Sequence, residues 1–257
     1  MLFSWLRRRK RKKLIEAPFP PEWLAILEEH VGHYRLLSEA ERERLRDHLR
    51  IFLAEKEWEG CQGLEMNDTV KVTVSALAAL MALGMDDFHF ENVQTILVYP
   101  EGYVAPEHKA IADDLVLEGD AERLGEAHYR GPVILSWAEL VDNARHPGSG
   151  HNLVFHEFAH QLDMLDGEVE GNPPMPDRKF AHRWNRVMGK EYDHLCDAVD
   201  SGAATVLDEY GATSPQEFFA VVTECFFDDP YTLKKHHLKL YELFRDYYRQ
   251  DPARWFA

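Results

Sequence analysis

The chain of 257 residues is long enough to bury one large hydrophobic core or two small ones. Hydrophobic residues make up 45% and charged residues 29%, a composition typical of soluble globular proteins. The 29 Lys and Arg residues against 45 Asp and Glu residues give a formal net charge of −16. This balance argues against a general nucleic-acid-binding protein, because such a protein needs a basic surface.

The cysteines indicate a reducing compartment. Cys61, Cys196 and Cys225 are far apart, odd in number and without a CxxC pair. A disulfide framework is therefore not expected, and the cytoplasm is the predicted location. No apolar run reaches the length of a membrane span.

The first residues combine a short apolar stretch with a basic run. Met1 to Leu6 precede seven consecutive basic residues, Arg7 to Lys13. A secretory signal has the opposite order and a longer apolar stretch. Without these seven charges the rest of the chain carries −23 instead of −16, so tail and body have opposite signs. We expect residues 1–17 to form a disordered or peripheral tail; the alternative is a weak contact with a membrane surface or a polyanion.

Prolines at 18, 20 and 21 separate this tail from the folded part. We expect residues 18–257 to form a single domain, with a helical part over 18–90 and a catalytic part over 91–257.

Helical spacing dominates the first part of this domain. Ser38 followed by Glu41 is a capping box, and the apolar residues after it predict a helix over about 39–56. Asp68 is the candidate cap of a second helix, over about 69–83, whose small apolar residues indicate burial.

Beyond residue 90 the spacing of apolar residues changes from the helical repeat to a pattern typical of strands. Strands are predicted at 93–99 and 131–137, and the acidic segment between them, about 104–131, is expected to hold at most a short strand or hairpin. Further helices are predicted over about 138–144, 152–165, 180–198, 214–227 and 233–248. This pattern indicates an α+β fold, mostly helical, with a small twisted sheet beside helix 152–165.

The centre of the second part is the sequence HNLVFHEFAH, which contains an H-E-x-x-H motif at His156, Glu157 and His160. On a helix, residues four apart share a face, so both imidazoles can bind one metal ion. Glu157 then lies beside the metal, where it can take a proton from a water that the metal activates. The alternative is a buried helix with two satisfied histidines, but buried polar side chains need partners, which favours a metal.

A catalytic zinc takes three protein ligands, and three places in the sequence can supply the third. At the metzincin spacing the chain has Asp163 in place of the turn glycine and Asp166 in place of the last histidine. The region where thermolysin-like enzymes place a glutamate offers only Asp177. A later apolar helix carries Glu217 and Glu224, seven residues apart and nearly on one face.

At these residues a resemblance becomes specific. The chain resembles the Mlc titration factor A family of bacterial zinc peptidases, whose catalytic region is similar to that of anthrax lethal factor. The resemblance covers the chain from about residue 35 onward and leaves the basic tail outside. It is carried by the stretches VYP (98–100), GPVILSW (131–137), HNLVFHEFAHQLDMLDG (151–167) and YGATSPQEFFAVVTECFF (210–227).

The resemblance implies a gluzincin-type site with one Zn²⁺ per chain. His156 and His160 match the two histidine ligands, Glu217 matches the third ligand, and Glu157 matches the general base. Tyr210 matches a tyrosine that stabilises the oxyanion, a role that suits a phenol because it donates a hydrogen bond without adding charge to the resting site.

Further residues are candidates for supporting roles. Glu224 and Asp163 are expected to bind the ligating imidazoles through their other ring nitrogen, with surface charge as the alternative. The strand residues Val133, Ile134, Leu135 and Ser136 are the candidate edge that pairs with an extended peptide.

Two functions are therefore expected. The first is a zinc-dependent peptidase, aminopeptidase-like on short peptides. The second, implied by the resemblance, is a regulatory protein that binds and sequesters an Mlc-like transcriptional repressor, with a peptidase activity that is secondary or latent.

Overall fold

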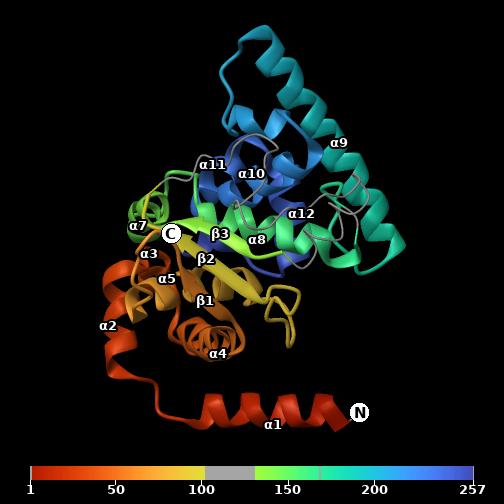
Figure 1. Ribbon diagram of the computed structural model, residues 1–257. Helices are drawn as coiled ribbons and strands as arrows, with labels where there is room; N and C mark the ends of the chain where they lie inside the picture. The colour runs from red at the N-terminus through yellow and green to blue at the C-terminus, as the bar shows by residue number, and fades with distance from the viewer. Residues whose placement is uncertain (1, 102–130, 168, 257) are drawn as a thin grey trace, which may run out of the picture.

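The computed structural model describes residues 2–101, 131–167 and 169–256 (Figure 1). The predicted strand or hairpin around 104–131 lies outside the described residues. The helices are α1 (Leu2–Glu16), α2 (Pro21–His30), α3 (Gly32–Leu36), α4 (Glu39–Glu55), α5 (Asp68–Ala82), α7 (Trp137–Arg145), α8 (Leu153–Asp163), α9 (Arg178–Ser201), α10 (Pro215–Asp228), α11 (Pro230–His236) and α12 (Leu238–Tyr248). The strands are β1 (Glu57–Gly60), β2 (Thr95–Tyr99) and β3 (Val133–Ser136), and short 3-10 segments are η1 (Met164–Asp166), η2 (Glu209–Ala212) and η3 (Pro252–Arg254).

A small parallel sheet lies among these helices, in the order β1-β2-β3. β3 lies next to α8, the helix that carries the H-E-x-x-H motif (Figure 1). The prediction of a mostly helical α+β fold with a small sheet beside this helix is confirmed. β1 was not predicted, because its sequence EWEG has no apolar alternation and follows α4 directly.

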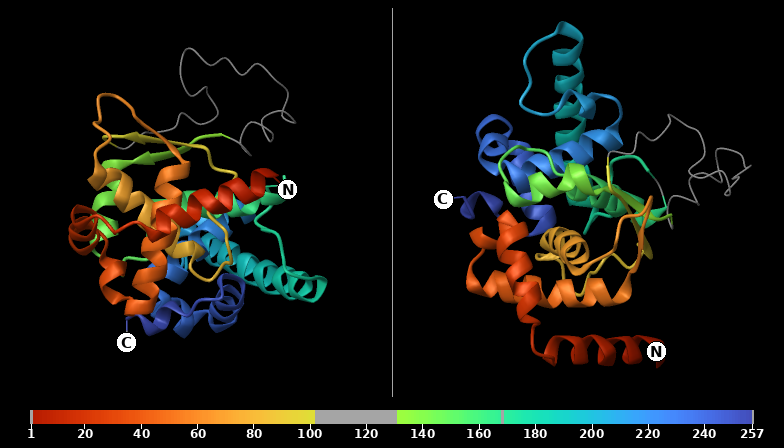
Figure 2. Two further views of the ribbon diagram at one scale, coloured as in Figure 1. Left: turned by 90° about the horizontal axis from the view of Figure 1, so that it is seen from below. Right: turned by 60° about the vertical axis from the view of Figure 1, so that its left-hand side comes forward.

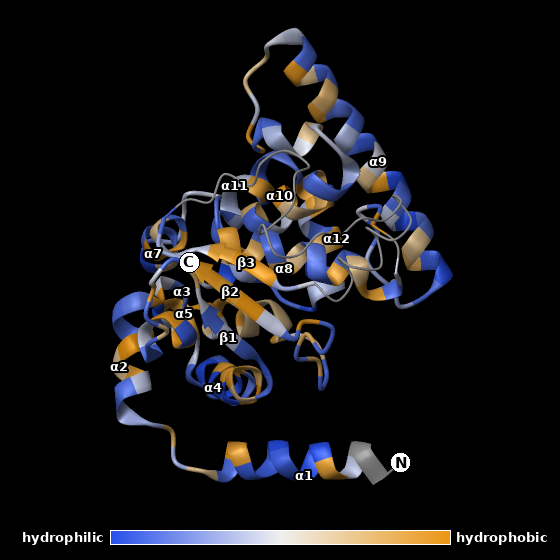
Figure 3. Ribbon diagram, in the orientation of Figure 1, coloured by the Kyte–Doolittle hydropathy of each residue, from blue (hydrophilic) through white to orange (hydrophobic). Residues whose placement is uncertain are grey.

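The central layer is formed by α5, α8 and α10. Every residue of α5 from Val72 to Ala82 is buried, because helices α2, α4 and α8 cover it. Figure 3 shows the hydrophobic residues gathered in β2, β3 and the central helices, whereas α1 is largely hydrophilic. Helices α8 and α10, which carry the candidate metal ligands, therefore belong to the buried centre of the domain.

Local capping explains where the helices of the first part begin. The predicted capping box is confirmed: Ser38 N–H donates to Glu41 Oε2 at 2.9 Å, and Glu41 N–H donates to Ser38 Oγ at 3.4 Å. For α5 the predicted cap is wrong by one residue. Asn67 accepts the N–H of Val70 at 3.1 Å, while Asp68 is the first helical residue and accepts a hydrogen bond from Trp23 Nε1.

The predicted helix over 233–248 is also wrong in one respect, because two helices occupy this region. α11 begins earlier, at Pro230 after the cap Asp229, and ends at His236. His237 has non-helical backbone angles, and its Nδ1 lies 2.9 Å from Glu191 Oε2 on α9. A contact with a distant helix thus accompanies the break, and periodicity alone could not reveal it.

The basic segment is a helix, α1, where the sequence predicts a disordered or peripheral tail. Arg11 is only 4% exposed and donates hydrogen bonds to Glu55, Asp87 and Glu91 at 2.7–3.1 Å. These carboxylates come from α4 and the loop before β2, so no local sequence pattern pointed to them. α1 lies at the periphery along α4 (Figures 1 and 2). Among the helices of the described ranges, none qualifies as an apolar segment that could span a lipid bilayer.

Candidate metal centre

Helix α8 presents the motif from a well-defined starting point. Asn152 caps it by accepting the N–H of Phe155 at 3.2 Å. The helix ends at Asp163, two residues earlier than predicted, and the chain turns at Gly167, whose positive φ of 90° suits glycine. Its buried residues on the core side are Val154, Phe155, Phe158, Ala159 and Leu162. Burial of that face points His156, Glu157 and His160 toward α10.

Helix α10 supplies the carboxylates. The predicted cap is confirmed, because Ser214 Oγ accepts the N–H of Glu217 at 3.2 Å and Pro215 occupies the first helical position. Glu217 and Glu224 are seven residues apart and both contact α8 side chains. The pairing of α8 with α10 therefore brings two separate stretches of sequence into one site.

Three ligand atoms converge at this site. His156 Nε2 lies 3.0 Å and His160 Nε2 lies 3.4 Å from Glu217 Oε2, and the two Nε2 atoms are 3.2 Å apart. Tetrahedral ligands at about 2.0–2.1 Å from a zinc ion would be about 3.3–3.4 Å apart. Within the described part of the chain, His156, His160 and Glu217 form the group whose ligand atoms lie close enough together to hold a metal ion. Their spacing already fits a tetrahedral metal site.

Charge within the cluster also suits a cation. Burial alone would raise the pKa of Glu217, but the adjacent imidazoles of His156 and His160 outweigh burial and lower it to about 2. Burial would lower the pKa of His156, but the carboxylates of Glu217 and Glu224 outweigh it and raise this pKa. The cluster therefore favours a positive charge at this position, and a bound metal ion would replace the proton on His156.

Glu224 reaches the far side of a histidine ligand. Its Oε1 lies 2.7 Å from His156 Nδ1, and its Oε2 accepts the N–H of Asn152 at 2.7 Å. A carboxylate at Nδ1 fixes the proton there and leaves Nε2 free to bind a metal. Through its hydrogen bond with Asn152, the same carboxylate also stabilises the backbone at the start of α8.

We expect Glu224→Gln to weaken metal affinity by about 10- to 100-fold, because the charge that holds the His156 tautomer is lost. The measurement is the metal dissociation constant, obtained by competition with a chromogenic chelator. Glu191→Gln is the matched control, since it neutralises the carboxylate at Nδ1 of His237, a histidine outside the metal-holding cluster, and should leave the affinity unchanged. Equal affinities of Glu224→Gln and wild type would contradict a role of Glu224 in ligand orientation.

Asp163, the last residue of α8, lies near enough to His160 for their charges to interact. It is buried, which excludes surface charge, and its Oδ2 accepts the N–H of Gly171 at 2.8 Å. In the hydrogen bonds of the described ranges it joins no ring nitrogen of a motif histidine. Asp166 is exposed, and Asp177 caps α9 by accepting the N–H of Phe180. Neither of these two aspartates belongs to the metal-holding cluster.

Tyr210 and Glu157 lie beside the cluster. Tyr210, on η2, is 54% exposed, and its ring centroid is 6.1 Å from that of His156. Partial burial and the charges of Glu217 and Glu157 raise the pKa of Tyr210, which keeps its phenol protonated. Burial likewise raises the pKa of Glu157. A cleft beside them is lined by Glu139, Asn143, His151, Asn152, Leu153, His156, Glu157 and Glu224.

β3 is an outer strand of the described sheet. It pairs with β2, with Ile96 opposite Val133 and Tyr99 opposite Ser136. The side chain of Ser136 caps α7 by accepting the N–H of Glu139 at 3.4 Å, so only its backbone is available to a peptide. Pairing of Val133–Ser136 with a substrate stays a prediction.

Asp228 supports the loop before α8 and was not predicted from the sequence. Asp228 Oδ2 accepts the N–H groups of Gly148 and Gly150 at 3.1 and 2.8 Å and the hydroxyl of Ser149 at 3.1 Å. It thereby fastens the loop that leads into α8, and both glycines have positive φ. Its position four residues after Glu224, on the same apolar helix, was the available signal.

A helix-borne H-E-x-x-H pair joined by a glutamate from a second helix defines a metallopeptidase site. The model of the family described as glucose-regulated metallo-peptidase M90 matches residues 4–249. The match includes the basic run, which corrects the expectation that the resemblance begins near residue 35.

Individual relatives agree with this family. The chain is 38% identical over 249 residues to the uncharacterized protein slr2042 of Synechocystis sp., covering 96% of this chain and 90% of the relative. It is 32% identical to Mlc titration factor A of Serratia proteamaculans (84% of this chain, 82% of the relative) and of Yersinia pestis (84% and 80%). The chain belongs to the M90 family of metallopeptidases, related to Mlc titration factor A.

Proposed function

We propose that this metallopeptidase uses one zinc ion per chain and acts as an aminopeptidase on short peptides in the cytoplasm. The observation that carries the proposal is the convergence of His156, His160 and Glu217 at the spacing of a tetrahedral site. Two nitrogens and one carboxylate oxygen are ligands that zinc prefers, and three of them leave a position for water.

A bound zinc ion would polarise the scissile carbonyl and acidify water. The protein then has to move protons and stabilise charge. Glu157 takes the proton of the attacking water and delivers it to the leaving amine, a task that suits a carboxylate whose pKa burial has raised. Tyr210, held protonated, donates a hydrogen bond to the carbonyl oxygen as that oxygen becomes negative.

The cleft supports a preference for a free N-terminus. Glu139, on α7, lines the same cleft as Glu157, and its side chain makes no ion pair in the described part of the chain. An exposed carboxylate at this place suits a protonated α-amino group. Aminopeptidase specificity follows if the cleft binds the first residue of the substrate.

The test is a comparison of free and N-acetylated forms of the same short peptide. We expect kcat/KM to be at least about tenfold higher for the free amine, because one charged contact is worth roughly that factor. Glu139→Gln should reduce this preference, whereas Asp142→Asn, a neighbouring exposed carboxylate on α7, should retain it. Equal rates for both peptides would reject the aminopeptidase assignment.

A second function is favoured by the relatives, which are named for titrating Mlc. We infer that this chain also binds a repressor of that type, with peptidase activity secondary or latent. Glu157→Gln separates the two functions, because sequestering should survive it and proteolysis should not. Isothermal titration of a candidate repressor measures its affinity for this variant and for wild type. A variant that loses both repressor binding and peptide turnover would reject an independent sequestering function.

A further inference from the structure

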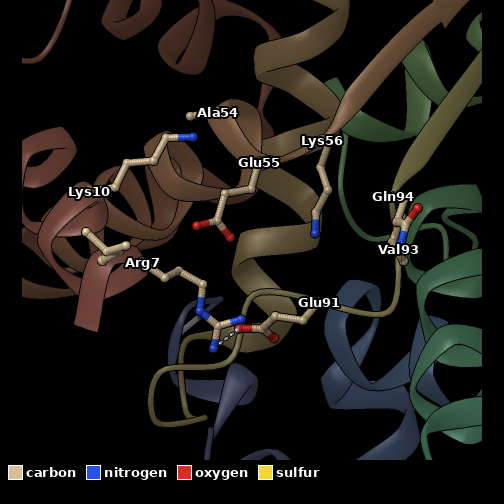
Figure 4. A pocket seen from close by; sticks show the side chains of 9 residues that line it. Arg7, Lys10, Ala54, Glu55, Lys56, Glu91, Val93 and Gln94 are labelled. Atoms are coloured by element: carbon tan, nitrogen blue, oxygen red, sulfur yellow. Dashed lines mark ion pairs between the residues drawn. The ribbon is translucent and has the colours of Figure 1, made fainter. Parts of the chain in front are cut away.

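Helix α1 is fixed to the body by one side only. Its inward residue is Arg11, buried among Glu55, Asp87 and Glu91. Figure 4 shows the neighbouring pocket between α1 and α4, where Arg7 reaches Glu91 at 4.0 Å. A buried arginine shared by three carboxylates fixes the rotation of the helix, so the other side must face away from the protein.

The side opposite Arg11 combines apolar and basic residues. At about 100° per residue, Trp5, Leu6, Arg9, Lys13 and Glu16 fall within about 60° of the direction opposite Arg11. Glu16 pairs with Lys12 at 3.6 Å, and Leu6 also borders the pocket between α1 and α4. We call Trp5, Leu6, Arg9 and Lys13 the outer face of α1. Trp5 is 55% and Leu6 48% exposed, and Arg9 lies over the Trp5 ring at 5.5 Å. Both apolar side chains belong to the first two turns of the helix, with the basic residues following them.

The positive charge of this region is not neutralised by the body. In the described part of the chain, Arg8, Arg9, Lys10 and Lys13 are exposed and make no ion pair. They belong to a protein whose residues outside Arg7 to Lys13 carry a net charge of −23. A local basic surface on an acidic protein selects an anionic partner and confines it to that surface.

We propose that the outer face of α1 docks this protein on an anionic lipid bilayer. Tryptophan and leucine beside lysine and arginine are the residues that enter the boundary between headgroups and acyl chains. A nucleic acid would use the basic residues but not the exposed apolar pair, and the acidic body would repel a long polyanion. α1 lies at one end of the molecule and α9 to α11 at the other (Figures 1 and 2), so docking leaves the metal centre accessible.

The test is co-sedimentation of the full chain with vesicles of phosphatidylcholine, with or without about 30% phosphatidylglycerol, at about 0.1 M salt. We expect binding only to the anionic vesicles. Arg9→Glu with Lys13→Glu, and separately Trp5→Ser with Leu6→Ser, should each lower the partition coefficient at least about tenfold. All four residues are exposed, so both variants should keep the fold, which circular dichroism verifies.

The matched control is Lys235→Glu with Lys239→Glu, which makes the same charge change on exposed residues four apart in α11 and α12. This control should bind like wild type. The proposal is overturned if the wild-type protein does not bind anionic vesicles, or if the control loses binding as fully as the α1 variants. It is also overturned if double-stranded DNA displaces the protein from the vesicles at equal phosphate concentration.

Discussion

Replacing Glu157 with Gln is expected to lower kcat by about 10²- to 10⁴-fold while the metal stays bound. Glutamine keeps the size of the side chain but cannot accept the proton of the attacking water. The ligands His156, His160 and Glu217 are unchanged by this replacement, so metal content should equal that of wild type. The measurement is single-turnover kinetics on a short peptide, paired with metal content of the same sample.

The control for this experiment is Glu170→Gln, which alters an exposed carboxylate in the loop after α8 and should retain wild-type turnover. Retained turnover in Glu157→Gln would reject Glu157 as the base. Loss of metal along with turnover would assign Glu157 to holding the site together instead.

Replacing Tyr210 with Phe should lower kcat by about 10²- to 10³-fold and change KM little, because a hydrogen bond made only in the transition state is lost. The phenol is more than half exposed, so the fold should not depend on it. Steady-state kinetics over a range of substrate concentrations separates kcat from KM.

Tyr231→Phe, on α11, removes the hydroxyl of another exposed tyrosine and should leave both constants unchanged. An increase in KM with constant kcat for Tyr210→Phe would mean that the phenol binds substrate and transition state equally.

The fold was predictable where the signal was local. The capping box at Ser38 and Glu41 fixed the start of α4, and the small apolar run of α5 indicated burial. Prediction failed where distant contacts decide the structure. Arg11 orders α1 through carboxylates 44 to 80 residues away, and His237 divides a continuous helical pattern beside Glu191 on α9.

In the site, too, the residues within one helix were predictable from local spacing, whereas the contacts between helices were not. The H-E-x-x-H spacing places His156 and His160 on one helix face, a local consequence of the helical repeat. Residue spacing alone left the third ligand open between Glu217, Glu224 and the aspartates, and the resemblance selected Glu217. The packing of α8 against α10 separates these candidates, because Glu217 Oε2 faces both Nε2 atoms and Glu224 faces Nδ1 of His156. The contribution of Asp228 to the loop before α8 depended on that packing as well.

The most direct measurement is metal content by mass spectrometry of protein purified without added metal, with wild type beside Glu217→Ala. We predict about one zinc ion per wild-type chain, because three ligand atoms already have tetrahedral spacing, and loss of nearly all zinc in the variant. Full zinc occupancy in Glu217→Ala would move the third ligand to another carboxylate such as Glu224 or Asp166. Absence of zinc from both proteins would contradict the zinc-peptidase account and favour the sequestering function.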